Sequence, residues 1–176
     1  MKRRELFSSL VSPFKKDEQK QEEVIRPPYY LRINDAGENT IESDFHKSCI
    51  SCDDKNCATV CEEQIIVIQE DGTPKLDFKN SGCTYCDECA IACPTDVLKV
   101  EYKKNINAIF SIDMSKCLSW QQTMCFSCKD PCLDDAISFA GMFFPEIQDD
   151  KCTSCGFCVK VCPTEAVTYK IKDEED

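Results

Sequence analysis

The chain has 176 residues, a formal net charge of −11, and 16 Cys but only five Gly. This composition excludes a Gly-rich or collagen-like chain, and the acidic balance argues against a nucleic-acid-binding protein. Because its content of large apolar side chains is close to the lower limit for a self-sufficient core, we expect disulfides or metal centres to help hold it together.

The first 16 residues differ in charge from the rest, with five Lys or Arg and one Glu. Apolar side chains between Leu6 and Phe14 recur at helical spacing, which fits either a docking segment or an arm lying on the chain's own acidic body. No apolar run of signal-peptide length follows Arg3 and Arg4, and no uncharged apolar stretch of 18 residues is present. We therefore expect a cytoplasmic protein without a membrane span, whose thiols stay reduced.

The Cys residues fall into four groups of four, separated by similar gaps, so one unit is repeated four times. The second and fourth groups have the spacing C-x2-C-x2-C-x3-C and are followed by Pro94 and Pro163. The first group has the spacing C-x2-C-x4-C-x3-C and the third C-x7-C-x2-C-x3-C. In chain order the groups are Cys49, Cys52, Cys57 and Cys61; Cys83, Cys86, Cys89 and Cys93; Cys117, Cys125, Cys128 and Cys132; and Cys152, Cys155, Cys158 and Cys162.

The second and fourth groups match the Cys run that binds [4Fe-4S] clusters in bacterial ferredoxins. Three thiolates two residues apart lie on a loop that curls round one face of a cubane, and the fourth Cys reaches the neighbouring cluster. Zinc sites use C-x2-C pairs a dozen or more residues apart, and disulfides need an oxidising compartment. We therefore expect all 16 Cys to ligate four [4Fe-4S] clusters, which leaves His46 without a role as a ligand.

Two pairings between the groups remain open. Sequential pairing is favoured by the lower closure entropy of short loops, whereas nested pairing would join the first group to the fourth. The nested arrangement occurs in iron–sulfur subunits of some molybdoenzymes, whose C-x2-C-x4-C motif resembles the first group. Sequential pairing gives the ligand sets Cys49, Cys52, Cys57 and Cys93; Cys83, Cys86, Cys89 and Cys61; Cys117, Cys125, Cys128 and Cys162; and Cys152, Cys155, Cys158 and Cys132.

The segments between the groups predict short strands and short helices. Because Pro suits the first position of a helix, we expect helices over 94–98 and 163–167. Tyr85, Trp120 and Phe157 lie inside the Cys loops and are expected to shield clusters from water. Apolar runs predict strands over 65–68, 75–78, 97–100, 108–112, 136–139 and 167–171, with a turn at 71–74.

Together these elements predict an α+β protein of two tandem bacterial-type two-cluster ferredoxin folds. We expect a basic N-terminal arm and lead-in over 1–39, a first two-cluster domain over 40–103 and a second over 104–176. No Ser–His–Asp arrangement, P-loop or dinucleotide-binding fingerprint is present, so we expect an electron carrier or accessory protein and not an enzyme.

Three stretches of the chain resemble the NapF family, the ferredoxin-type accessory proteins of the periplasmic nitrate reductase system. They are Ile25–Tyr30, Leu76–Asn80 before the second group, and Cys117–Gln121 with its long gap to Cys125. The chain departs from the family in the first group, where two extra residues lie between the second and third Cys. The resemblance implies a cytoplasmic protein that binds the precursor of the nitrate reductase catalytic subunit before export and assists its maturation, by electron or cluster delivery. The alternative is a general electron-transfer ferredoxin, or a redox subunit that links a donor to a reductase.

Overall fold

The computed structural model describes residues 24–30 and 47–172, which form short strands and single-turn helices. The basic segment over residues 1–16 and His46 lie outside this described part. Within it, none of the helices is long and apolar enough to cross a membrane. The elements in chain order are α2 (Asn56–Thr59), β1 (Ile66–Ile68), β2 (Pro74–Leu76), α3 (Glu88–Ile91), the 3-10 helix η2 (Val100–Tyr102), β3 (Ala108–Ile112), β4 (Ile137–Ala140), β5 (Phe143–Ile147), α4 (Phe157–Lys160) and β6 (Val167–Ile171).

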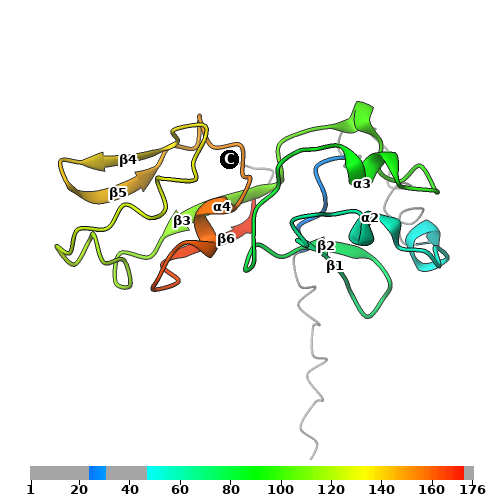
Figure 1. The fold of residues 1–176 in the computed structure, drawn as a ribbon, viewed down its shortest axis with the longest axis horizontal. Coiled ribbons are helices and arrows are strands. Elements are labelled where there is room, and N and C mark those ends of the chain that lie inside the picture. The colour runs from blue at the N-terminus through cyan, green and yellow to red at the C-terminus, as the bar shows by residue number, and fades with distance from the viewer. Residues whose placement is uncertain (1–23, 31–46, 173–176) are drawn as a thin grey trace, which may run out of the picture.

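The strands pair into three antiparallel two-stranded sheets, β1 with β2, β3 with β6 and β4 with β5. In the sheet of β3 and β6, Phe110 lies opposite Tyr169, and the buried residues of β3 alternate with more exposed ones. This alternation is what a sheet with one face on a core requires. Figure 1 shows β1, β2, α2 and α3 on the right and the other two sheets with α4 towards the left. The fold is therefore α+β.

The two halves of the chain are built alike. In the second half, β3 and β6 pair with each other and the β4–β5 hairpin lies between them in the sequence. In the first half, residues 24–30 take the place of β3, because Tyr30 forms an antiparallel bridge with Leu98. The Leu76 N–H also donates to the carbonyl of Ile25 at 2.8 Å. Part of the stretch that the sequence placed in a lead-in thus packs as the opening segment of the first half.

Most of the predicted strands are confirmed. Those over 108–112 and 167–171 have the expected bounds, and the strands expected over 65–68, 75–78 and 136–139 are shifted or shortened by one or two residues. The strand predicted over 97–100 is wrong, since only Leu98 forms a bridge and η2 follows at once.

The helices predicted over 94–98 and 163–167 are wrong, because both segments are turns. Asp96 and Glu165 have φ angles of 58° and 52°, which end any helical course. The chain turns there so that its amides reach the preceding sulfur, as when the Ala166 N–H donates to Cys162 Sγ at 3.1 Å. The helices instead contain the third Cys of each of the first, second and fourth groups: Cys57 in α2, Cys89 in α3 and Cys158 in α4.

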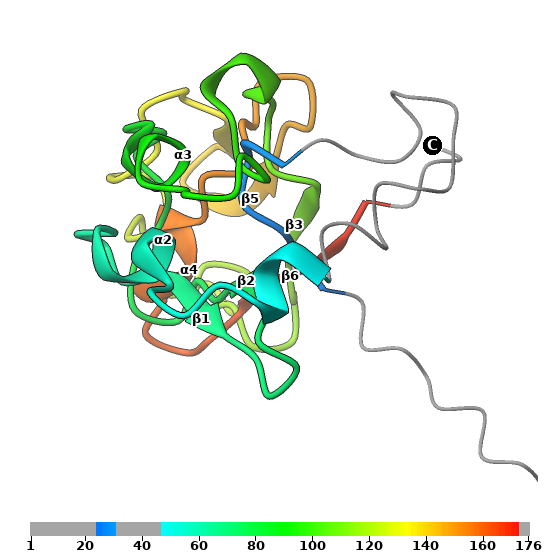
Figure 2. The same ribbon diagram turned by 90° about the vertical axis from the view of Figure 1, so that its right-hand side faces the viewer.

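One continuous cluster of buried side chains runs through both halves. At its centre the ring of Phe78, which has no exposed surface, meets Phe110 of β3 and Tyr169 of β6 edge-on, with centroids 5.4 and 5.0 Å apart. Aromatic edge-to-face contacts of this kind add to the burial energy of the rings. In the view along the long axis, α2 and α3 lie one above the other at the end nearest the viewer (Figure 2). The halves therefore pack together end to end around Phe78.

Candidate metal centres

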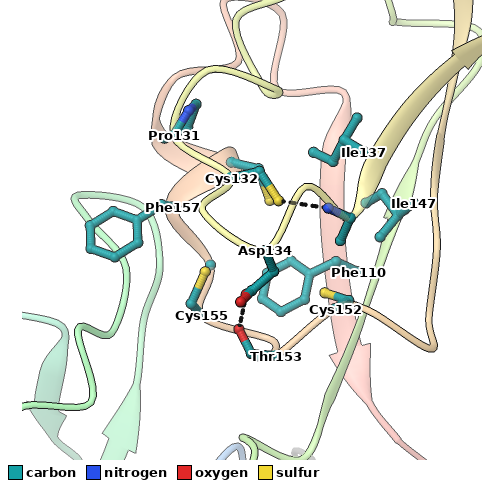
Figure 3. A pocket seen from close by; sticks show the side chains of 13 residues that line it. Phe110, Pro131, Cys132, Asp134, Ile137, Ile147, Cys152, Thr153, Cys155 and Phe157 are labelled. Carbon is teal, nitrogen blue, oxygen red and sulfur yellow. Dashed lines mark hydrogen bonds between the residues drawn. The ribbon is translucent and has the colours of Figure 1, made fainter.

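Four cavities are each lined by four thiols. Three of the four come from one Cys group and the fourth comes from the last Cys of the neighbouring group. Figure 3 shows one of them, with Cys132, Cys152 and Cys155 around the same space. The sets are Cys49, Cys52, Cys57 and Cys93; Cys61, Cys83, Cys86 and Cys89; Cys117, Cys125, Cys128 and Cys162; and Cys132, Cys152, Cys155 and Cys158.

These sets are the ones that sequential pairing predicts. Cys93 lies with the first group and Cys61 with the second, so the two groups of each half exchange their last Cys. Nested pairing would need the first and fourth groups to share a cavity, but Cys49 and Cys155 line cavities in different halves. The structure therefore brings all 16 predicted site residues into four sets, each contained within one half.

Three of the cavities are nearly equal in size. The cavity of the second group is larger and extends to Pro27, Pro28 and Tyr29. All 16 Cys are free thiols. In residues 24–30 and 47–172, no three His, Cys, Asp or Glu side chains converge closely enough to hold a single metal ion. Four equal sets of soft sulfur donors, each spread round a cavity, fit a group that is larger than one ion and binds thiolates.

Crowding and burial raise the pKa of seven of the 16 thiols. Burial, followed by the charges of neighbouring Cys residues, raises the pKa of Cys89 and Cys158 to about 12 and that of Cys83 to about 11. Four thiolates therefore do not share a cavity unless a cation accompanies them. Bound iron would supply that charge, because a coordinating thiol is deprotonated outright.

The last Cys of the second and fourth groups behaves in the opposite way. Burial opposes the ionisation of Cys93, but the backbone N–H groups of Leu98, Thr95 and Val97 point at its sulfur and its pKa falls below the usual value. The same turn after Pro163 lowers the pKa of Cys162, against the effect of burial. Amides aimed at a sulfur stabilise its thiolate form. These turns, where the sequence predicts helices, are thus part of the sites.

Lys55 holds the longer loop of the first group. It is the residue before α2, with a φ angle of 47°, and its ammonium group donates to the carbonyls of Cys49 and Gly72, the latter at 2.9 Å. This ties the two extra residues of the loop to the turn between β1 and β2. The role of Lys55 was missed from the sequence, since no motif marks it.

The long gap in the third group closes on itself. The Thr123 N–H donates to the carbonyl of Leu118 at 2.9 Å, and the buried Ser119 hydroxyl donates to the carbonyl of Cys125 at 3.2 Å. The indole of Trp120 donates to the carbonyl of Pro145 at 3.2 Å, which fastens the loop to β5. The insertion therefore brings Cys117 and Cys125 to the same cavity despite their separation.

Only one of the three aromatic side chains expected to shield a cluster lines a cavity. Phe157 lines the cavity that also contains Cys155 and Cys158, and Figure 3 shows its ring on the side of Cys155 away from Cys152. Trp120 packs on Phe144 with ring centroids 4.9 Å apart, and Tyr85 points to the other half of the molecule, where its hydroxyl donates to the carbonyl of Thr153. Burial, with the charges of Cys83, Cys155 and Cys152, raises the pKa of Tyr85, so this side chain lies near thiols of two sites. The shielding role expected for Trp120 and Tyr85 stays a prediction.

Two protein-family models match the chain. The first, a 4Fe-4S dicluster domain, matches residues 48–97, and the second, a 4Fe-4S binding domain, matches residues 145–168. Each range carries Cys groups that line the cavities described above. The protein is therefore an iron–sulfur protein of the [4Fe-4S] type.

Curated relatives share most of the chain. The ferredoxin-type protein NapF of Escherichia coli K12 is 33% identical over 148 residues, which cover 82% of this chain and 83% of that protein. The ferredoxin-type protein NapF of Haemophilus influenzae is 35% identical over 161 residues, covering 85% and 81%. The ferredoxin-type protein NapG of Escherichia coli K12 is 27% identical over 154 residues, covering 74% and 66%. The chain belongs to the NapF family of ferredoxin-type proteins.

Proposed function

We propose that this protein carries four [4Fe-4S] clusters, one in each cavity, with the four Cys that line the cavity as ligands. The observation that carries this proposal is the repetition of one four-thiol cavity at four places. A bound [4Fe-4S] cluster accepts and releases one electron at a time. The thiolates would hold the irons, and the turns after Pro94 and Pro163 would direct N–H groups at the sulfurs. The first two-cluster domain would span 40–103, with residues 24–30 packed against it, and the second would span 104–176.

We further propose that the protein works in the cytoplasm on the precursor of the periplasmic nitrate reductase catalytic subunit, as an electron-carrying accessory of its maturation. Family membership supports this role. The net charge of −11 suits a basic surface on the partner, because complementary charge speeds encounter. The chain itself would act as a carrier and binding partner without catalysing a reaction of its own.

Metal analysis of protein purified without oxygen tests the cluster content. We expect about 16 iron and about 16 sulfide per chain, with a brown colour from thiolate-to-iron absorption. A zinc-loaded protein, or one that is folded and colourless with little iron, would contradict the proposal.

A binding experiment separates the maturation role from that of a general electron carrier. The immobilised full-length protein should retain the unexported catalytic-subunit precursor and release the mature, exported enzyme. Equal retention of both forms, or of neither, would favour the alternative of a general ferredoxin. The observation that favours this alternative is the single core shared by the two halves, because it holds four cavities together in one molecule.

A further inference from the structure

The two halves of the molecule meet through the second and fourth Cys groups. The Cys83 N–H donates to the carbonyl of Cys155 at 2.7 Å, so two Cys loops from different halves share a backbone hydrogen bond. The Tyr85 hydroxyl donates to the carbonyl of Thr153 and accepts from the N–H of Ile106 at 3.1 Å. Both loop-to-loop contacts therefore join the same pair of groups.

Two glycines allow this close approach. A Cβ atom on Gly82 would lie 2.5 Å from the backbone N of Phe157 and 2.7 Å from the carbonyl oxygen of Cys155. A Cβ atom on Gly156 would lie 2.2 Å from the ring of Phe78. Real Cβ atoms do not approach backbone so closely, hence Gly82 has no side chain at a point where a methyl group would push the halves apart.

The other two cavities lie away from this junction. The cavity of the first group is lined by residues of the first half, among them Ile68 and Gly72 of the β1–β2 hairpin. The cavity of the third group is lined by residues of the second half, among them Ile112 and Pro145. In Figure 1 α4, which carries Cys158 of the fourth group, lies in the middle of the molecule beside the first half.

We infer that electrons cross between the halves from the site of the second group to that of the fourth, so that the four sites follow one another in the order first, second, fourth, third. The inference rests on the four-cluster function proposed above. One electron would leave the cluster bound at the second group and enter the cluster bound at the fourth. The former cluster is oxidised as the latter is reduced, so the step balances without a further reactant. Because tunnelling weakens steeply with distance, Gly82 is a positioning residue for this step.

Magnetic coupling between reduced clusters tests the order by electron paramagnetic resonance. The variant Cys52→Ala with Cys125→Ala removes one ligand from each outer site and should keep about eight irons and a split, spin-coupled spectrum. The matched variant Cys86→Ala with Cys155→Ala keeps the outer sites and should show two uncoupled signals. Uncoupled signals in the first variant, or coupling in the second, would overturn the order.

A single substitution covers the case in which these double variants do not fold. Gly82→Ala in the full chain should keep about 16 iron and lose part of the splitting that the unaltered protein shows. Gly141→Ala is the control: its φ of 70° makes the substitution strained, but that strain lies in the turn between β4 and β5, and a Cβ there meets nothing within 4 Å. An unchanged spectrum in Gly82→Ala at full iron content would sink the inference alone, whereas an iron-poor unaltered protein would sink the proposed function as well.

Discussion

At the scale of single residues, the last Cys of a group differs from the other three in what surrounds its sulfur. Cys93 is approached by amides of the turn after Pro94, and the Thr95 hydroxyl lies 3.6 Å from its Sγ. Hydrogen bonds to cluster sulfurs raise the reduction potential, because they stabilise the more negative reduced form. The turn would thus raise the potential of a cluster bound at the outer site of the first half.

We expect Thr95→Val to lower the reduction potential of one cluster by up to about 60 mV, the equivalent of a tenfold shift for one electron. Valine keeps the shape of threonine and removes only the hydroxyl. Potentiometric titration followed by electron paramagnetic resonance would measure the shift. Thr168→Val, on the exposed face of β6 where Thr168 pairs with Ser111, is the control and should leave all potentials unchanged. A rise in potential after Thr95→Val would contradict the argument.

Sequence spacing was enough to predict which thiols gather round each cavity, but not the backbone around them. The Cys runs and the C-P endings repeat with fixed periods, and loop entropy alone favours the sequential sets that the structure shows. The turns after Pro94 and Pro163 were read as helices because Pro suits a helix start. The left-handed φ angles of Asp96 and Glu165 cannot be recognised from the sequence, since neither Asp nor Glu requires that conformation.

At the scale of elements, the strands were predictable where one face alone is buried. β3 and β6 combine β-branched residues with clear alternation, and their bounds agree with the prediction. Val97–Val100 is rich in β-branched residues too, yet within it Leu98 forms a single bridge, to Tyr30, and η2 begins at Val100. Pairing partners that lie far away in the chain decide such cases, and a local pattern does not contain them.

The single-turn helices depend on the sites that they flank. α3 has four residues, follows Asp87 in a left-handed conformation, and receives no side-chain cap. An isolated helix of this length is not stable, because forming the first turn costs more free energy than its hydrogen bonds contribute. Its order must therefore come from Cys89, which fixes α3 to the cavity, and from the Asp87 carboxylate, which accepts hydrogen bonds from Tyr29 at 2.6 Å and from Lys103 at 2.7 Å.

We expect replacement of any ligand of this site to destabilise the first half as a whole, since metal binding is coupled to folding. Cys86→Ala, at the exposed member of the set, should lose about four irons and lower the thermal midpoint of the protein. Differential scanning calorimetry with iron analysis measures both. Thr84→Ala, in the same loop but without a ligand role, should retain the iron and the midpoint. Unchanged melting of Cys86→Ala at full iron content would refute the coupling.

At the scale of the whole molecule, two repeated units behave as one because their cores merge. Phe78 comes from the first half, yet its ring packs on Phe110 and Tyr169 of the second and closes over Gly156. A linker alone would leave two separate electron carriers with a variable distance between them. The shared core fixes that distance, and the hydrogen bond between the Cys83 and Cys155 loops lies beside it.

Phe78→Ala should therefore weaken the packing between the two halves more than it destabilises either half alone. Removing a fully buried phenyl ring costs about 3–5 kcal/mol, which corresponds to a fall of about 10 °C in the melting midpoint of a chain of this size. Because each half keeps its own thiol sets, the iron content should stay near that of the unaltered protein while the single melting transition splits into two. Limited proteolysis should then cut at Lys103–Asn105, between the halves. Phe144→Ala, which removes a ring that is 37% exposed and packs on Trp120 at the far end, should leave one transition. A Phe78→Ala protein that still melts in one step, at an unchanged temperature, would show that the halves are held together by something other than this core.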